Sequence, residues 1–443
     1  MTTLRPYLLL LQALLTAALI TLAPAGQAGA IRVSEEGRRA SSPEIAIGPD
    51  GAINVIWLDK GLTADRPPPK PRKPGEHSHR SSTDLYFARS EDGGSTWSTP
   101  VRVNDTDGEV WGFSVSKPRI GVGPSGTIHV FYPANDRAEE LDKAIVSARY
   151  RRSTDNGRSF SAAVNMNRPV TEDREDLLGE GLAMSNSFGT MGVAPDGTVI
   201  TAWQNVATMK DQTAGADGVI AVSTDDGESF SKEIIAIPGN KVCPCCQLTI
   251  EFGDDFALMG LRYLFAEGRD SMVARSDDGG MSFGPSGRLD FAPWDINGCP
   301  LKPTELAIAG DTIYAAAYTG GEDPAGLYFT RSTDGGRSFS GKQQVHPAAD
   351  LADAPALSVD NDGQVRLVWH TKIDGARRLY TAVSTDSGKT FSAPLEVATP
   401  PGKSMHPASA VAADGSVFVT WEQENEEVFV ISLPQADQSV AQN

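Results

Sequence analysis

One eight-residue pattern recurs six times along the chain, and it constrains the fold more than any other feature of the sequence. It reads Ser, any residue, Asp, any residue, Gly, any residue, Ser or Thr, and then Trp or Phe. The six copies begin at Ser90, Ser153, Ser223, Ser276, Ser332 and Ser384. A length of 443 residues alone suggests two or three domains, but a regular repeat can fill that length as one architecture.

Each copy carries the residues of a tight, self-capped turn. The Asp carboxylate can accept hydrogen bonds from nearby backbone N–H groups and hydroxyls, and the Gly permits a positive φ. Apolar segments flank the copies, so we expect each turn to connect the two outer strands of a hairpin. Calcium binding is the alternative, although the spacing differs from that of an EF-hand. The aspartates predicted to be structural are Asp92, Asp155, Asp225, Asp278, Asp334 and Asp386.

A second repeat lies between these turns and consists of an apolar segment, a tight turn and another apolar segment. Regular copies span residues 45–57, 120–131 and 191–203, and less regular copies start near Leu248, Leu306, Leu357 and Ala408. Their Asp-Gly and Ser-Gly turns are hairpin signals. The sequence therefore predicts seven inner hairpins, one more than the number of Asp-containing turns.

The eight-residue pattern resembles the Asp-box, or BNR repeat, of the sialidase (neuraminidase) superfamily, and the resemblance covers nearly all of the chain after residue 30. It implies an all-β propeller with four-stranded antiparallel blades. The hairpin count favours seven blades, with six, as in sialidases, as the alternative. The segment that begins at Ile31 resembles the fourth-strand segment 101–104, so we expect the N-terminal strand to complete the last blade and close the ring.

The first 30 residues are predicted to be a signal peptide. Arg5 precedes an apolar stretch over residues 7–23, and Ala-Gly-Ala at 28–30 is a cleavage signal. A retained membrane anchor is the alternative, and no later apolar run is long enough to span a bilayer. We therefore expect a periplasmic or secreted protein with a single sialidase-like propeller over residues 31–433 and a polar tail over residues 434–443.

The net charge of -18 argues against nucleic-acid binding and against docking on anionic membranes, both of which need clustered Lys and Arg. The only basic cluster lies in the proline-rich loop 61–82, which we interpret as a solvated loop, with an acidic partner as the alternative. The expected partner is a glycan or another small molecule, bound by a monomer.

All four cysteines fall on two loops that lead into neighbouring inner strands. They are Cys243, Cys245, Cys246 and Cys299. Loops of adjacent blades lie side by side, so we expect the four to cluster near the mouth of the channel. In an exported protein two disulfides are one interpretation. A thiolate site for Cu(I) or Zn²⁺ and a redox-active disulfide are the alternatives.

The resemblance also implies a sialidase site, in which three arginines hold the substrate carboxylate, a Tyr activated by a Glu is the nucleophile and an Asp is the acid/base. The first of those arginines belongs to an Arg-Ile-Pro motif. Here residues 41–45 read Ser-Ser-Pro-Glu-Ile, and Arg119 in the next repeat is the nearest substitute. No Tyr/Glu pair can be assigned. The chain is therefore interpreted as glycan-directed, with hydrolysis and non-catalytic carbohydrate binding both open.

Further site residues are predicted from their loops. The catalytic candidates are Arg119, Glu180, Arg262 and Asp270, and the residues expected on the ligand face are Arg269, Trp294 and His406. A surface ion pair of Arg269 with Asp270, and ordinary packing of Trp294, are the alternatives. Two other functions stay open: a binding or scaffold propeller with a cysteine-based metal or redox site, and a plain interaction platform.

Overall fold

The computed structural model describes residues 29–65, 83–137, 144–167, 186–205, 215–296, 298, 300–346 and 350–435. The signal-peptide prediction therefore falls almost entirely outside the described residues, as do most of the loop 61–82 and the tail after Gln435. No helix in the described part of the chain is long and apolar enough to cross a membrane.

The described residues form antiparallel sheets, as expected for an all-β chain. The first two sheets have the orders β2 (Arg38–Ile47), β3 (Ile53–Leu62), β4 (Asp84–Ser90), β5 (Val101–Arg102) and β6 (Arg119–Val122), β7 (Ile128–Arg137), β8 (Ala144–Ser153), β9 (Val164–Asn165). A single-turn 3-10 segment, η1 (Thr63–Asp65), follows β3.

The third sheet has eight strands. It contains β10 (Asn186–Val193), β11 (Val199–Asn205), β12 (Ala216–Ser223), β13 (Ile234–Val242), β15 (Ala257–Phe265), β16 (Gly268–Ser276) and β17 (Gly284–Arg288) in that order, with β14 (Thr249–Phe252) paired to β15. Only the pair Val242 and Tyr263 joins β13 to β15.

The last three sheets again have four strands each. Two have the orders β18 (Thr304–Ala309), β19 (Thr312–Thr319), β20 (Gly326–Ser332), β21 (Ser340–Gln344) and β22 (Asp350–Val359), β23 (Val365–Ile373), β24 (Ala376–Ser384), β25 (Leu395–Glu396). The third has the order β1 (Ile31–Arg32), β28 (Glu427–Leu433), β27 (Val417–Gln423), β26 (Ser404–Val411).

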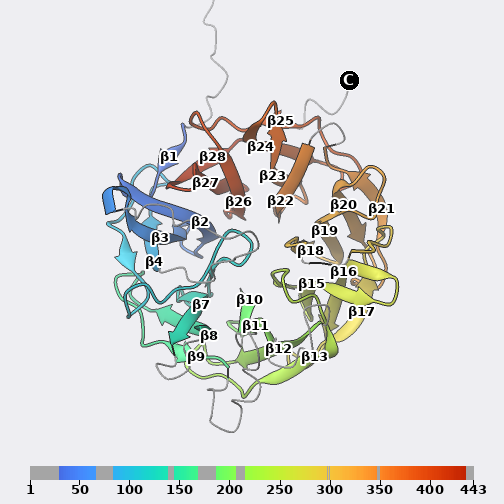
Figure 1. The fold of residues 1–443 in the computed structure, drawn as a ribbon, viewed down its shortest axis with the longest axis horizontal. Helices are drawn as coiled ribbons and strands as arrows, with labels where there is room; N and C mark the ends of the chain where they lie inside the picture. Colours follow the sequence, from blue (N-terminus) through green and yellow to red (C-terminus); the bar gives the residue numbers. More distant parts are fainter. Residues whose placement is uncertain are drawn as a thin grey trace, which may run out of the picture.

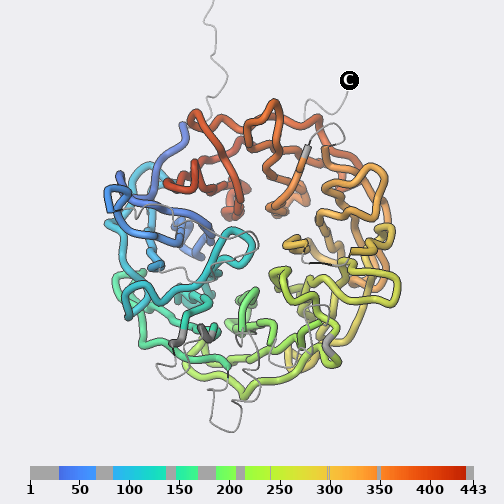
Figure 2. Tube along the Cα trace, in the orientation of Figure 1, coloured from blue at the N-terminus to red at the C-terminus, as the bar shows by residue number. Residues whose placement is uncertain are grey.

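The sheets stand around a central axis, with β2, β10, β18, β22 and β26 nearest the centre (Figure 1). The chain passes once around this ring, so that its first and last described segments meet (Figure 2). There, Ile31 pairs with Val430 and Arg32 pairs with Phe429. The Val33 N–H also donates to the carbonyl of Val428 at 2.8 Å. The N-terminal strand is therefore the outer strand of the last sheet.

The apolar core lies between neighbouring sheets. One cluster joins residues of β2–β4 to β26–β28, and another joins β3 and β4 to β6 and β7. Each of the strands β3, β11, β23 and β27 carries a tryptophan that is almost wholly buried. These residues are Trp57, Trp203, Trp369 and Trp421. Three of them stack on an aromatic ring of the adjacent third strand.

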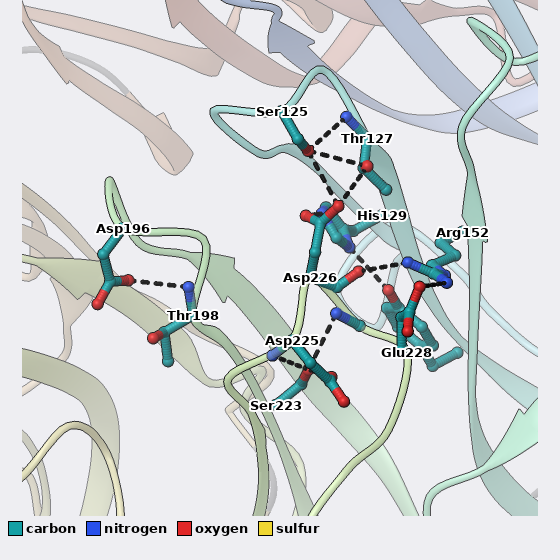
Figure 3. Close-up of polar contacts among 12 residues, drawn as sticks. Ser125, Thr127, His129, Arg152, Asp196, Thr198, Ser223, Asp225, Asp226 and Glu228 are labelled. Atoms are coloured by element: carbon teal, nitrogen blue, oxygen red, sulfur yellow. Dashed lines mark hydrogen bonds and ion pairs between the residues drawn. The ribbon is translucent and has the colours of Figure 1, made fainter.

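The Asp-box turns lie between third and fourth strands, as their flanking segments suggested. In the turn after β12, the Ser223 hydroxyl donates to Asp225 Oδ1 at 2.7 Å (Figure 3). The Ser229 N–H donates to the same oxygen at 2.9 Å, and the Ser229 hydroxyl donates to Oδ2 at 2.5 Å. These bonds, the Ser229 hydroxyl first, lower the pKa of Asp225 to about 2. The carboxylate thus closes its own turn.

The same turn also contacts the preceding sheet. Asp226 Oδ2 accepts hydrogen bonds from the Thr127 hydroxyl at 2.6 Å and from the Ser125 hydroxyl at 3.0 Å (Figure 3). Arg152 donates to the Asp226 carbonyl at 3.0 Å. At Gly227, where φ is +75°, an added Cβ would lie 1.8 Å from the Tyr150 hydroxyl oxygen. The turn therefore fits against its neighbour only with a glycine at this position.

We predict that Gly227→Ala destabilises the protein more than Gly197→Ala does. Both glycines have positive φ, and a substitution costs about 1–2 kcal/mol for that reason alone. An added Cβ at Gly197 meets nothing closer than 3.8 Å, whereas Gly227→Ala must displace Tyr150, at typically about 1–3 kcal/mol more. Urea unfolding followed by tryptophan fluorescence measures both losses. Equal losses would contradict the proposed contact between sheets.

Candidate functional site

A polar cavity of about 180 Å³ lies among the inner strands of the ring. Its lining comes from the seven strands β2, β6, β10, β14, β18, β22 and β26, and from Lys117, which precedes β6. Its charged residues are Glu44, Lys117, Arg119, Glu251 and Glu305. We call this space the axial cavity.

A recurrent bulge directs several of these inner strands. The register of the inner pair shifts before Glu44, Thr190, Ala356 and Ala408. Within each shift one non-glycine residue has a left-handed backbone, with φ of 54° at Ser42, 52° at Phe188, 48° at Ala354 and 50° at His406. A proline or glycine follows each of them. Such bulges re-aim side chains, and backbone strain of this kind is concentrated at functional sites.

Glu44 is held by two cations. Its Oε2 lies 2.9 Å from Lys117 Nζ and 3.0 Å from Arg119 Nη1. Burial alone would raise the pKa of Glu44, but the attraction of Lys117 and Arg119 outweighs it and lowers the pKa. Glu44 is therefore ionised at neutral pH.

Arg119 uses only part of its guanidinium group. Among the described residues its Nε and Nη2 have no hydrogen-bond partner, although both atoms are buried. The Ser409 hydroxyl, on β26 in the same lining, likewise has no partner among the described residues. Unpaired buried donors are costly, so these groups indicate where a polar ligand or ordered water would bind.

The other two carboxyl groups of the cavity, Glu251 and Glu305, have raised pKa values, in contrast to Glu44. Burial raises the pKa of Glu251 to about 8, with further help from the nearby Glu305 charge and against the attraction of Arg119. Burial also raises the pKa of Glu305, against Arg119 and Lys117. At neutral pH the two cations of the cavity therefore face an ionised Glu44 and a protonated Glu251.

Of the three catalytic candidates that the structure describes, only Arg119 is found in this cavity. Arg262 is 1% exposed, and it donates to the carbonyls of Arg269 at 2.9 Å and Tyr318 at 2.7 Å. Asp270 is also buried, and it accepts from the Trp294 N–H at 3.1 Å and pairs with Arg288. Both side chains therefore make hydrogen bonds to backbone groups of neighbouring segments. Glu180 lies outside the described residues.

Three residues were expected together on the ligand face, and the structure places them at three different positions. They are Arg269, Trp294 and His406. Arg269 and Asp270 are both buried, so neither lies at the surface, and Arg269 Nη1 lies 3.5 Å from Cys243 Sγ. Trp294 lines a second cavity, of about 270 Å³, together with Lys302, Tyr318 and Asp353. The His406 N–H donates to His370 Nδ1 at 3.1 Å, and His406 Nε2 lies 3.9 Å from Glu422 Oε1.

Three of the four cysteines meet in one buried cluster. Cys243 Sγ lies 3.7 Å from Cys245 Sγ and 3.9 Å from Cys246 Sγ. Both distances are far longer than an S–S bond of about 2.05 Å, so Cys243 forms no disulfide with Cys245 or Cys246. Cys299 lies outside the described residues, so the two expected disulfides stay a prediction. Hydrogen bonds from the Cys245 and Cys246 thiols hold the pKa of Cys243 well below its usual range, whereas burial raises the pKa of Cys246 to about 12.

Sequence reasoning missed four of the five charged residues of the axial cavity. Only Arg119 was a candidate; Glu44, Lys117, Glu251 and Glu305 were not. A signal was present in Ser-Pro-Glu-Ile at 42–45 and Lys-Pro-Arg-Ile at 117–120, where charged residues follow or flank a proline next to an inner strand. Proline inside a strand pattern usually marks a bulge or an edge.

Comparisons with known proteins agree with this architecture. A family model described as a BNR repeat-like domain matches residues 74–292. A protein of unknown function from Dyadobacter fermentans has a similar structure, with a TM-score of 0.52 and 15% identity over 93% of this chain and 99% of its own. An ulvan lyase, a polysaccharide lyase solved with bound GlcA(1-4)Rha3S, is similar with a TM-score of 0.54 and 14% identity over 94% of this chain and all of its own.

A Hadza microbial sialidase is also similar in structure, with a TM-score of 0.48 and 15% identity over 88% of this chain and 77% of its own. No curated protein sequence matches the chain. At these identities the likenesses concern the fold.

We predict that Glu251 makes the wild-type protein less stable as the pH rises. Its pKa in the folded state, about 8, exceeds the ordinary value of 4.5, so the folded protein holds a proton that the unfolded chain releases. Stability is therefore lost between about pH 5 and pH 8. Glu251→Gln should remove this loss, on the order of 4 kcal/mol at pH 8, and should match the wild type near pH 4.

The measurement is urea unfolding across this pH range. Glu267→Gln is the control, because the Glu267 carboxylate is at the surface and Arg288 lowers its pKa. A parallel pH dependence of Glu251→Gln and wild type would show that Glu251 is ionised in the cavity.

Proposed function

Because a BNR repeat-like family model matches residues 74–292, we propose that the chain is a sialidase-like, glycan-directed protein that binds an acidic sugar unit in the axial cavity. The observation that carries this proposal is the unpaired edge of Arg119. Its Nη1 holds Glu44, and its Nε and Nη2 remain without a partner among the described residues.

The unpaired edge suits a carboxylate. Nε and Nη2 lie on one side of the planar guanidinium, where two parallel N–H bonds can reach both oxygens of a carboxylate. Lys117 adds a second positive charge near Glu44. The unpaired edge of Arg119 is therefore a cationic donor inside a chain of net charge -18, which favours the acid group of a sugar over a neutral ring.

The remaining lining suits the neutral part of the same ligand. A protonated Glu251 can donate a hydrogen bond to a sugar oxygen, and the Ser409 hydroxyl is a further donor or acceptor. A volume of about 180 Å³ is smaller than a typical drug-sized pocket of roughly 300–1,000 Å³, which favours a single sugar unit. The similar ulvan lyase was solved with a glucuronate-containing saccharide, a ligand of this acidic class.

Glycoside hydrolysis is a second candidate function, favoured by the contrast between two carboxyl groups. Glu251 keeps its proton at neutral pH and Glu44 does not. Groups with pKa values moved apart in this way serve as acid and base in glycosidases. In that reaction Glu251 would donate its proton to the leaving oxygen. One cavity arginine in place of three argues against a standard exo-sialidase mechanism.

We also infer the finer organisation of the ring. The eight-stranded sheet is best explained as two blades joined by the single pair Val242 and Tyr263, which gives seven blades, with β1 completing the last. The seven strands that line the axial cavity support the same count. Export to the periplasm or beyond, as the first 30 residues suggest, would bring a monomer into contact with extracellular glycans.

We predict that Arg119→Gln abolishes recognition of acidic sugars. Titration calorimetry with 3'-sialyllactose and with a glucuronate disaccharide should detect binding to the wild type and none with lactose. Loss of two charge-assisted hydrogen bonds should weaken binding at least about tenfold, and Arg119→Lys should weaken it too, because lysine lacks the fork. Arg102→Gln, an exposed arginine, is the matched control.

Unfolding curves of the variants should stay close to that of the wild type, since Lys117 still pairs with Glu44. Unchanged affinity in Arg119→Gln, or no binding of either acidic probe by the wild type, would refute the proposal.

We predict for the second candidate that Glu251→Gln stops hydrolysis but keeps binding. Release of sialic acid or of reducing ends from the same two saccharides measures the reaction. If wild type and Glu251→Gln are equally inactive while both bind, the protein is a binding module and the hydrolase interpretation is wrong.

A further inference from the structure

The second cavity, which contains Trp294, is a feature that binding of one acidic sugar unit does not use. Its volume is about 270 Å³, and its lining includes Trp294, Tyr318, Lys302 and Asp353. We call it the aromatic cavity. Two aromatic rings and two opposite charges therefore line a space that is larger than the axial cavity of about 180 Å³.

The two cavities share two segments of the chain. Lys302 lines the aromatic cavity, and Glu305, three residues later, lines the axial cavity. On β22, Asp353 lines the aromatic cavity and Pro355 lines the axial cavity. Three residues of extended chain span at most about 11 Å. The two linings are therefore neighbours, at a separation that a disaccharide can span.

His406 lies close to both cavities. The next residue, Pro407, lines the axial cavity. Burial, and after it the neighbouring His370, hold the pKa of His406 well below its usual value, while Asp353 raises this pKa and Lys117 lowers it. A charged residue of each cavity therefore acts on His406. Its Nδ1 is buried without a hydrogen-bond partner among the described residues, which indicates a place for a ligand hydroxyl or an ordered water.

The aromatic rings are held in fixed positions. The Trp294 N–H donates to Asp270 Oδ1 at 3.1 Å, and the Trp294 carbonyl accepts from the Arg269 N–H at 3.0 Å. The indole packs against Gly320, where an added Cβ would lie 2.6 Å from Trp294 Cε2. Its ring centroid is 5.8 Å from that of Tyr318. The two rings thus form a preorganised wall of the cavity.

The chemistry of this lining suits a neutral sugar. A pyranose ring has a face of C–H groups, which packs favourably on the electron-rich face of an aromatic ring. Lys302 and Asp353 form an ion pair, so their charges offset each other. The paired ammonium and carboxylate groups still have donors and acceptors to spare for sugar hydroxyls. The axial cavity differs, because Arg119 has an unpaired cationic edge there.

We propose that the aromatic cavity binds the neutral sugar unit that is linked to the acidic unit in the axial cavity. Trp294 and Tyr318 supply the stacking surface, and Lys302 and Asp353 bind the hydroxyls. The ligand is then an acidic disaccharide or a longer oligosaccharide, and not a single acidic sugar. This inference rests on the proposed function, because it needs the acidic unit at Arg119.

The fold should tolerate removal of the indole. The two hydrogen bonds of Trp294 described above are made by its backbone, which a substitution leaves in place. The Arg262 guanidinium lies 5.2 Å from the indole, and it keeps its bonds to the carbonyls of Arg269 and Tyr318. Trp294→Ala is therefore a suitable test of the aromatic cavity.

The test compares an acidic sugar with and without its neutral partner. Titration calorimetry measures 3'-sialyllactose against methyl sialoside, and a glucuronate disaccharide against methyl glucuronide. For whichever acidic sugar the axial cavity accepts, the wild type should bind the longer saccharide at least about tenfold more tightly. Trp294→Ala should lose that difference and should keep the affinity for the methyl glycoside.

Two further variants control for the size and the position of the ring. Trp294→Phe retains an aromatic ring and should keep most of the difference in affinity. Gly320→Ala retains Trp294 but displaces its indole, so it should behave like Trp294→Ala. Unfolding curves show whether each variant is folded.

Equal affinity of the wild type for both saccharides of a pair, with loss of both in Arg119→Gln, would overturn this inference and leave the proposed function intact. Equal weakening of both saccharides in Trp294→Ala would show that the indole only packs, which also contradicts it. If the wild type binds none of the acidic saccharides, the proposed function itself fails, and this inference fails with it.

Discussion

The structure depends on the contact between the Asp-box turn of one sheet and the face of the sheet before it. In this contact Gly227 packs against Tyr150, while Asp226 accepts hydrogen bonds from Thr127 and Ser125. Other copies repeat the contact, with Gly157 against Phe87 and Gly388 against Phe329. Because these seams fix each sheet relative to the next, they also fix how the inner strands converge on the axis.

That convergence creates the axial cavity. Glu44, Arg119, Glu251 and Glu305 come from four different inner strands, and no two of these strands belong to the same hairpin. The recurrent bulge in the inner strands re-aims side chains at this end of the ring. The scaffold and the site thus depend on different structural features. Regular turns between the outer strands fix the scaffold, whereas bulges in the inner strands shape the site.

The sequence predicts the scaffold well because its signals are local. An Asp-box contains both the acceptor and the donors of its turn within seven residues, and Asp225 with Ser223 and Ser229 shows this directly. The pairing of β1 with β28 was also foreseen, because the segment at Ile31 resembles other fourth strands. Cys243, Cys245 and Cys246 lie together because they are near neighbours in sequence, and the expected approach of Cys299 to them stays a prediction.

The site was much harder to predict, because its contacts are not local. Glu44 and Lys117 are 73 residues apart in sequence, and nothing in the spacing relates either of them to Glu251. Arg262 and Asp270 looked functional because polar residues near a turn are usually accessible. The structure buries both and uses their hydrogen bonds for the backbone. Burial of this kind depends on packing between sheets, which a sequence pattern does not encode.

The central claim is that the unpaired edge of Arg119 receives the carboxylate of an acidic sugar. A crystal structure of the protein with a bound glucuronate disaccharide or 3'-sialyllactose tests it most directly. In that complex the carboxylate oxygens should lie within hydrogen-bond distance of Arg119 Nε and Nη2, with Glu44 still bound to Nη1. A saccharide bound elsewhere on the ring, with only water at Arg119, would contradict it.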